Sequence, residues 1–94
     1  MPGDDLEISA MRRRLSFMAR RRAMPEMEQI FDRYLTQHLE TMDGDQCLRF
    51  LRLLDLPDAD LLDWIMEIKP LPADVDRELI AQVAKSRHFS VAGV

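Results

Sequence analysis

Apolar residues recur at spacings of three and four along most of this chain, and a proline or a glycine marks each break in the pattern. Such spacing lines apolar side chains along one face of an α-helix, and no segment shows the period-two alternation of a half-buried strand. We therefore expect an all-α fold, a small five-helix bundle joined by short turns. The expected helices run from Leu6 to about Arg22, from Pro25 to near Glu40, from an Asp43 cap to the Leu56-Pro57 break, from an Asp58 cap to Ile68, and from about Ala73 to Lys85.

The 94 residues are enough for one hydrophobic core but not for two. We expect a single helical domain over residues 1–94, with residues 1–5 and 88–94 flexible because their sequences lack a helical period. The single cysteine, Cys47, rules out an internal disulfide. Its place on the apolar stripe of the third helix predicts a small buried group.

Two local patterns give more specific expectations. The sequence Asp43-Gly44-Asp45-Gln46 resembles a capping box, in which Asp43 caps the third helix and Gln46 reaches back. On the fourth helix, the helical spacing places Trp64 on the inward face with Leu61, Ile65 and Ile68. We expect Trp64 to be buried or largely so.

Charge is distributed unevenly along the sequence. The formal net charge is −4, yet residues 8–23 contain six arginines and no acidic residue. Residues 24–94 contain seven basic and fourteen acidic residues. Six like charges on one short helix repel one another, so helix stability gives no reason to collect them. We expect this basic segment to meet a negatively charged or acceptor-rich partner.

A contact surface is predicted on one face of the first helix. Phe17 falls off the apolar stripe of this helix and shares its face with Arg13, Arg14, Arg20 and Arg21. Aromatic and arginine side chains are enriched together at protein interfaces, whereas a guanidinium cluster is not typical of a core. The pattern therefore favours a partner-binding face.

The sequence offers little for catalysis, and we expect that the protein is not an enzyme. Its two histidines, His38 and His88, have no neighbouring nucleophile or carboxylate in the pattern of a triad. A zinc site would need more Cys and His than the chain has. The acids between Asp55 and Asp63 are explained by capping and by the helix dipole. We expect no catalytic residue, no metal and no cofactor.

No apolar run approaches the ~18 residues of a membrane span. The N-terminus has no apolar signal-peptide core, and its acidic residues do not fit a mitochondrial transit peptide, although a processed matrix protein would have a similar sequence. We therefore expect a cytoplasmic protein that does not insert into a membrane, and a monomer.

Two other classes of function stay open from the residues alone. The arginines of the first helix could follow phosphates, and residues 48–66 have a helix-turn-helix outline. The would-be recognition helix carries Asp58, Asp60, Asp63 and Glu67, which phosphate repels, so we expect no nucleic-acid partner. A nucleic-acid-binding regulator is thus the first alternative, and an antitoxin-like helical adaptor is the second.

The order and spacing of several segments resemble a known family. Residues 12–27 are followed by LRLL at 51–54, DLLDWIM at 60–66 and KP at 69–70. Over about residues 11–87 the chain is similar to the small FAD assembly factors of succinate dehydrogenase, bacterial SdhE and its mitochondrial counterpart. The resemblance implies a five-helix protein that binds the flavoprotein subunit of succinate dehydrogenase or fumarate reductase and promotes covalent attachment of FAD. It also implies that the attachment chemistry belongs to FAD and to the flavoprotein's own histidine.

The signature of this family is Arg-Gly-x-x-Glu, at the junction of the first two helices. Arg22 and Glu26 match it, whereas Ala23 stands where the family has glycine. A glycine there implies a positive φ or a close approach of the partner. The helical stripes place Arg22 and Glu26 outside the core, where the resemblance makes them a donor fork and an acceptor for the partner. The simpler interpretation is an i, i+4 surface pair worth a few tenths of a kcal/mol.

Together, the exposed face of the first helix and this motif define the predicted partner-binding residues. They are Arg13, Arg14, Phe17, Arg20, Arg21, Arg22, Ala23 and Glu26.

Overall fold

The computed structural model describes residues 5–87. Within them the chain forms α1 (Asp5–Ala19), α2 (Pro25–His38), the 3-10 helix η1 (Leu39–Thr41), α3 (Gly44–Leu54), α4 (Asp58–Ile65) and α5 (Arg77–Ser86). The predicted all-α, five-helix fold is confirmed, and no strand occurs in the described range. Residues 1–4 and 88–94, most of the ends expected to be flexible, lie outside the described residues, while Asp5 already belongs to α1.

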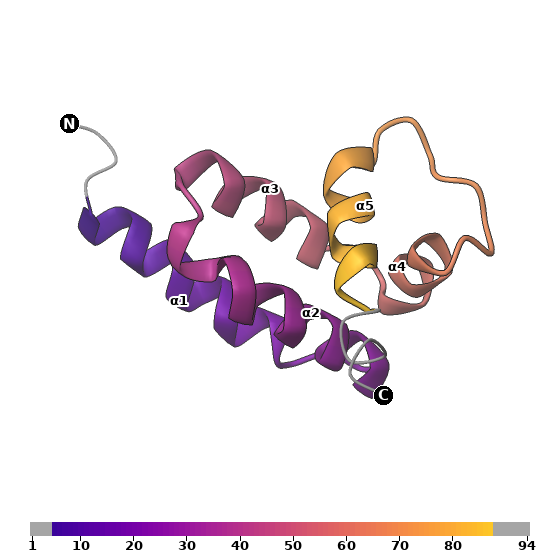
Figure 1. The fold of residues 1–94 in the computed structure, drawn as a ribbon, viewed down its shortest axis with the longest axis horizontal. Helices are drawn as coiled ribbons and strands as arrows, with labels where there is room; N and C mark the ends of the chain where they lie inside the picture. The colour runs from indigo at the N-terminus through magenta and orange to yellow at the C-terminus, as the bar shows by residue number, and fades with distance from the viewer. Residues whose placement is uncertain (1–4, 88–94) are drawn as a thin grey trace.

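The helices are arranged around α2. α1 packs against both α2 and α3, whereas α5 packs against α2 and α4. In Figure 1, α1 and α2 lie below α3, and α4 and α5 lie together on the right. Between residues 5 and 87, no helix has the length and hydropathy needed to cross a membrane.

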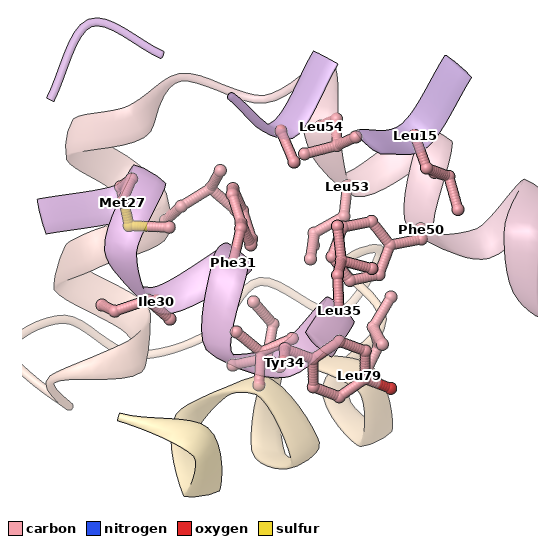
Figure 2. Close-up of a cluster of buried hydrophobic side chains, with 14 of the residues drawn as sticks. Leu15, Met27, Ile30, Phe31, Tyr34, Leu35, Phe50, Leu53, Leu54 and Leu79 are labelled. Carbon is pink, nitrogen blue, oxygen red and sulfur yellow. The ribbon is translucent and has the colours of Figure 1, made fainter. Parts of the chain in front are cut away.

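The core is built from the predicted apolar stripes. Leu15, Phe31 and Phe50 are fully buried. The rings of Phe31 and Phe50 meet edge to face with centroids 5.4 Å apart, and Tyr34 stacks on Phe50 at 5.5 Å. Figure 2 shows these side chains converging from α1, α2 and α3, with Leu79 of α5 beside Tyr34. Because three helices supply aromatic or leucine side chains to one cluster, their relative positions are set by its packing.

α3 begins as predicted. The Asp43 carboxylate accepts a hydrogen bond from the Gln46 amide, and the Gln46 side chain accepts one from the Asp43 amide. This capping box satisfies two N–H groups that the start of a helix leaves unpaired. In the first turn of α3, Cys47 is buried as predicted, and this burial raises the pKa of its thiol.

The starts of α4 and α5 differ from the prediction. Pro57 is the N-cap of α4, so Asp58 is its first helical residue and not its cap. α5 starts four residues later than predicted because Asp76 is its N-cap and accepts a hydrogen bond from the Leu79 amide. Arg49 of α3 binds the same carboxylate through two hydrogen bonds of 2.7 and 2.8 Å. Hydrogen bonding from Arg49 lowers the pKa of Asp76.

α4 ends three residues earlier than predicted. Glu67 takes a positive φ of 61°, and the amide of Ile68 donates to the carbonyl of Asp63. These are the features of a Schellman motif, which terminates a helix. Ile68 therefore lies beyond the helix and is 68% exposed, which corrects its predicted inward placement. Trp64 is only partly buried and packs against the edge of the core.

Candidate partner-binding site

The six arginines of the first segment separate into two groups. α1 ends at Ala19, earlier than predicted, so residues 20–24 form a turn before α2. Arg12 turns inward, where its Nε and Nη2 donate to the carbonyl of Met42 at 3.2 and 2.7 Å. Arg22 also turns inward. The remaining four are exposed: Arg13, Arg14, Arg20 and Arg21.

The four exposed arginines and Phe17 form what we call the basic-aromatic surface. Phe17 is 62% exposed, and the guanidinium carbon of Arg21 lies 5.0 Å from the centroid of its ring. Across the described part of the chain, none of the four arginines forms an ion pair. A partner that carries carboxylates could therefore pair with them without breaking an internal ion pair.

Arg22 is anchored inside the protein, with its side chain 10% exposed. Its Nε donates to Oδ1 of Asp58 at 2.8 Å, and its Nη2 lies 2.6 Å from the same oxygen. Its Nη1 and Nη2 donate to the carbonyls of Leu54 and Leu56 at 2.9 and 3.2 Å. The guanidinium also lies over the ring of Phe31, 5.6 Å from its centroid. The prediction that Arg22 lies outside the core is therefore wrong.

The carboxylate of Asp58 joins two points of the turn between α1 and α2. This side chain is 7% exposed. Besides the Arg22 guanidinium on Oδ1, its Oδ2 accepts a hydrogen bond from the Met24 amide at 3.1 Å. The amide of Arg22 donates in turn to Glu28 at 3.2 Å. The turn is thus held from α4 and from the first turn of α2.

The sequence reasoning missed both Asp58 and Glu28 as residues of this site. Asp58 was expected to cap α4, because an acid after a helix break is typical of a cap. The only available signal was that a buried arginine needs an acidic partner, and the pattern did not indicate that Arg22 is buried. Glu28 stands in the first turn of α2, where an acid is also favoured by the helix dipole.

Ala23, in the turn before α2, and Glu26, in the first turn of α2, are both exposed. Ala23 has no positive φ, since Glu67 is the non-glycine residue with one in the range 5–87. The alanine is therefore not strained by a left-handed backbone conformation. Glu26 does not form the i, i+4 pair, because the ion-pair partner of Arg22 is Asp58.

The described residues contain no group of three or more His, Cys, Asp or Glu side chains placed to hold a metal ion. Two acidic side chains of α4 form ion pairs with a lysine that follows the helix. Lys69 pairs with Asp60 at 3.5 Å and with Asp63 at 3.1 Å. This helix is the would-be recognition helix of the nucleic-acid alternative. Its carboxylates make it a poor surface for phosphate.

Comparison with known proteins gives consistent relatives. The chain is 32% identical over 76 residues to the mitochondrial succinate dehydrogenase assembly factor 2 of Aedes aegypti, which covers 79% of this chain and 47% of that protein. It is 24% identical over 86 residues to the FAD assembly factor SdhE of Acetobacter pasteurianus, which covers 92% of this chain and 79% of that protein. The chain thus spans about half the length of the mitochondrial relative. No solved structure matches it.

The family comparison covers most of the chain. The profile of the Sdh5 family, described as the flavinator of succinate dehydrogenase, matches residues 13–87. This range includes the basic-aromatic surface, the turn before α2 and all of the later helices. The family named from the sequence segments is therefore confirmed. The chain belongs to the family of flavinators of succinate dehydrogenase.

Proposed function

We propose that this protein is an assembly factor that binds the flavoprotein subunit of succinate dehydrogenase and promotes covalent attachment of FAD to it. The observation that carries the proposal is the family match over residues 13–87. The Acetobacter relative is named an FAD assembly factor, which supports the same activity.

The proposed activity depends on geometry and needs no catalytic group on this chain. FAD and the side chain that receives it both belong to the flavoprotein. A factor that binds one conformation of the flavoprotein raises the population in which these two groups are in contact. Holding reacting groups in a productive arrangement is enough to accelerate bond formation strongly.

The basic-aromatic surface supplies the features that such binding needs. Phe17 is an exposed ring that a partner pocket could bury, and aromatic anchors carry much of the affinity of protein interfaces. The surrounding arginines would speed the encounter with an acidic face of the flavoprotein. Glu26 adds an exposed hydrogen-bond acceptor near the arginines. Ala23 is also exposed, and its small side chain would let a partner approach the backbone closely.

The proposal also covers the oligomeric state, the range of partners and the site of action. We infer that the factor acts as a monomer and that it serves the related flavoprotein of fumarate reductase where one is present. We also infer that it does not bind nucleic acid, because α4 presents carboxylates where a recognition helix would need neutral or basic groups. The proposed site of action is the cytoplasm.

A titration of the purified flavoprotein subunit tests the proposed surface. We expect Phe17→Ala to raise the Kd about tenfold or more, as truncation of a central aromatic anchor does. Arg77→Ala is the control, since Arg77 is exposed at the start of α5, outside this surface. Raising the salt concentration should weaken wild-type binding because screening reduces the attraction of the arginines. Equal affinities for Phe17→Ala, Arg77→Ala and wild type would contradict the assignment of this surface.

A further inference from the structure

Asp58 holds the turn between α1 and α2 from a distant part of the chain. Arg22 and Asp58 are 36 residues apart in sequence, yet their side chains form a buried ion pair. The same carboxylate accepts from the Met24 amide. One side chain at the start of α4 therefore fixes both sides of Ala23, which lies between Arg22 and Met24.

The guanidinium of Arg22 is already occupied within the protein. Each of its three nitrogens donates inward, to Asp58, to the Leu54 carbonyl or to the Leu56 carbonyl. Its guanidinium carbon lies over the ring of Phe31. Because every nitrogen is used internally and the side chain is 10% exposed, a partner could form a two-point contact with this guanidinium only by breaking an internal one. By contrast, the side chains of Ala23 and Glu26 are exposed and ready to make contact.

We propose that Arg22 and Asp58 form a positioning pair for flavoprotein binding. The pair does not touch the flavoprotein; it holds Ala23 and Glu26 in the arrangement that the flavoprotein recognises. This inference rests on the proposed function. It gives Arg22 a role that differs from a direct contact, and it adds Asp58 to the residues on which binding depends.

Pre-organisation connects the pair to affinity. A binding-competent arrangement that is populated only part of the time raises the apparent Kd by the inverse of that fraction. If the released turn keeps the bound arrangement for about a tenth of the time, the Kd rises about tenfold. The exposed contact surface would be chemically unchanged in such a variant.

The test uses Asp58→Asn, which removes the charge and keeps the size of the side chain. Asp63→Asn is the matched control, since it removes the charge of another α4 carboxylate, whose ion-pair partner is Lys69 and not a residue of the turn. Two quantities are measured for each: the Kd for the purified flavoprotein subunit, and hydrogen exchange at the Met24 amide against core amides. We expect Asp58→Asn to raise both the Kd and the Met24 exchange rate about tenfold, and Asp63→Asn to change neither.

A second variant tests whether Arg22 positions the turn or touches the flavoprotein directly. It also provides a test if Asp58→Asn does not fold. In Arg22→Met/Asp58→Leu an apolar pair replaces the ion pair, a type of exchange that buried ion pairs often tolerate. Positioning predicts that this variant binds no more weakly than Asp58→Asn, and that its affinity follows the protection of the backbone amide at position 22, whose acceptor, Glu28, is unchanged. A protected turn with lost binding would show that Arg22 touches the flavoprotein and would overturn the inference.

The outcomes also distinguish the inference from the proposed function. Absence of any binding by the wild-type protein would refute the proposed function, and the inference with it. Binding by the wild type that Asp58→Asn leaves unchanged would refute the inference alone.

Discussion

Replacing Arg22 with alanine should destabilise the fold strongly, although the sequence places this residue at a surface junction. The change leaves the Asp58 carboxylate, 7% exposed, with the Met24 amide but without its cation. The carbonyls of Leu54 and Leu56 also lose their donors. Removing one partner of a buried ion pair typically costs about 3–5 kcal/mol. For a domain whose total stability is about 5–10 kcal/mol, that is roughly half.

Urea unfolding followed by circular dichroism measures this loss. With a denaturant slope of about 1–1.5 kcal/mol per molar urea for a chain of this size, the midpoint should fall by about 2 M or more. Arg21→Ala is the control, since Arg21 is exposed and contacts the Phe17 ring. It should change the free energy of unfolding by less than about 1 kcal/mol. An Arg22→Ala variant within about 1 kcal/mol of the wild type would refute the argument that the ion pair stabilises this junction.

Three further changes test other parts of the structure. Glu67→Gly should raise the free energy of unfolding by about 1 kcal/mol in urea titrations, because glycine relieves the cost of a positive φ of 61°; an unchanged midpoint would contradict this reason. Asp76→Asn should flatten the acid side of the stability curve. Hydrogen bonding from Arg49 gives the Asp76 carboxyl a folded-state pKa below its unfolded value, so its contribution is complete above about pH 4 and is lost as the pH falls through the lower folded pKa. Urea unfolding from pH 7 to pH 3 should show the wild type losing its advantage over Asp76→Asn below about pH 4, and a constant difference would oppose the assignment. Ala23→Gly should lower stability by about 0.4–1 kcal/mol through the unfolded state and leave flavoprotein binding equal or tighter; weaker binding would show that the alanine methyl makes a favourable contact.

The helices themselves could be predicted because each buries a stripe of three-to-four spacing. That spacing also identified Phe17 as an outward residue of α1, since its angle around the helix separates it from Leu15. The structure places both as the spacing indicates, with Leu15 buried and Phe17 exposed. Periodicity shows on which side of a helix a residue lies. For Leu15 and Phe17, that side decides whether the side chain is buried or exposed.

The helix ends and the inner part of the site depend on contacts that periodicity does not contain. α4 stops because Glu67 adopts a left-handed conformation, which nothing in the local sequence requires. Arg22 lies in a turn, where helical spacing no longer says which way a side chain points. Its direction is set by Asp58 and by the carbonyls at the end of α3, more than thirty residues away. Such a contact becomes visible only when the helices are packed.

The most direct test of the central claim is a reconstitution of FAD attachment. Purified flavoprotein subunit without bound flavin is incubated with FAD, with or without this protein, and covalent flavin is read as fluorescence of the subunit in a denaturing gel. We predict a faster rise of fluorescence with the wild-type protein, and a rate near background with Phe17→Ala or Glu26→Ala once both are shown to be folded. Equal fluorescence with and without the wild-type protein would contradict the claim that it promotes flavin attachment.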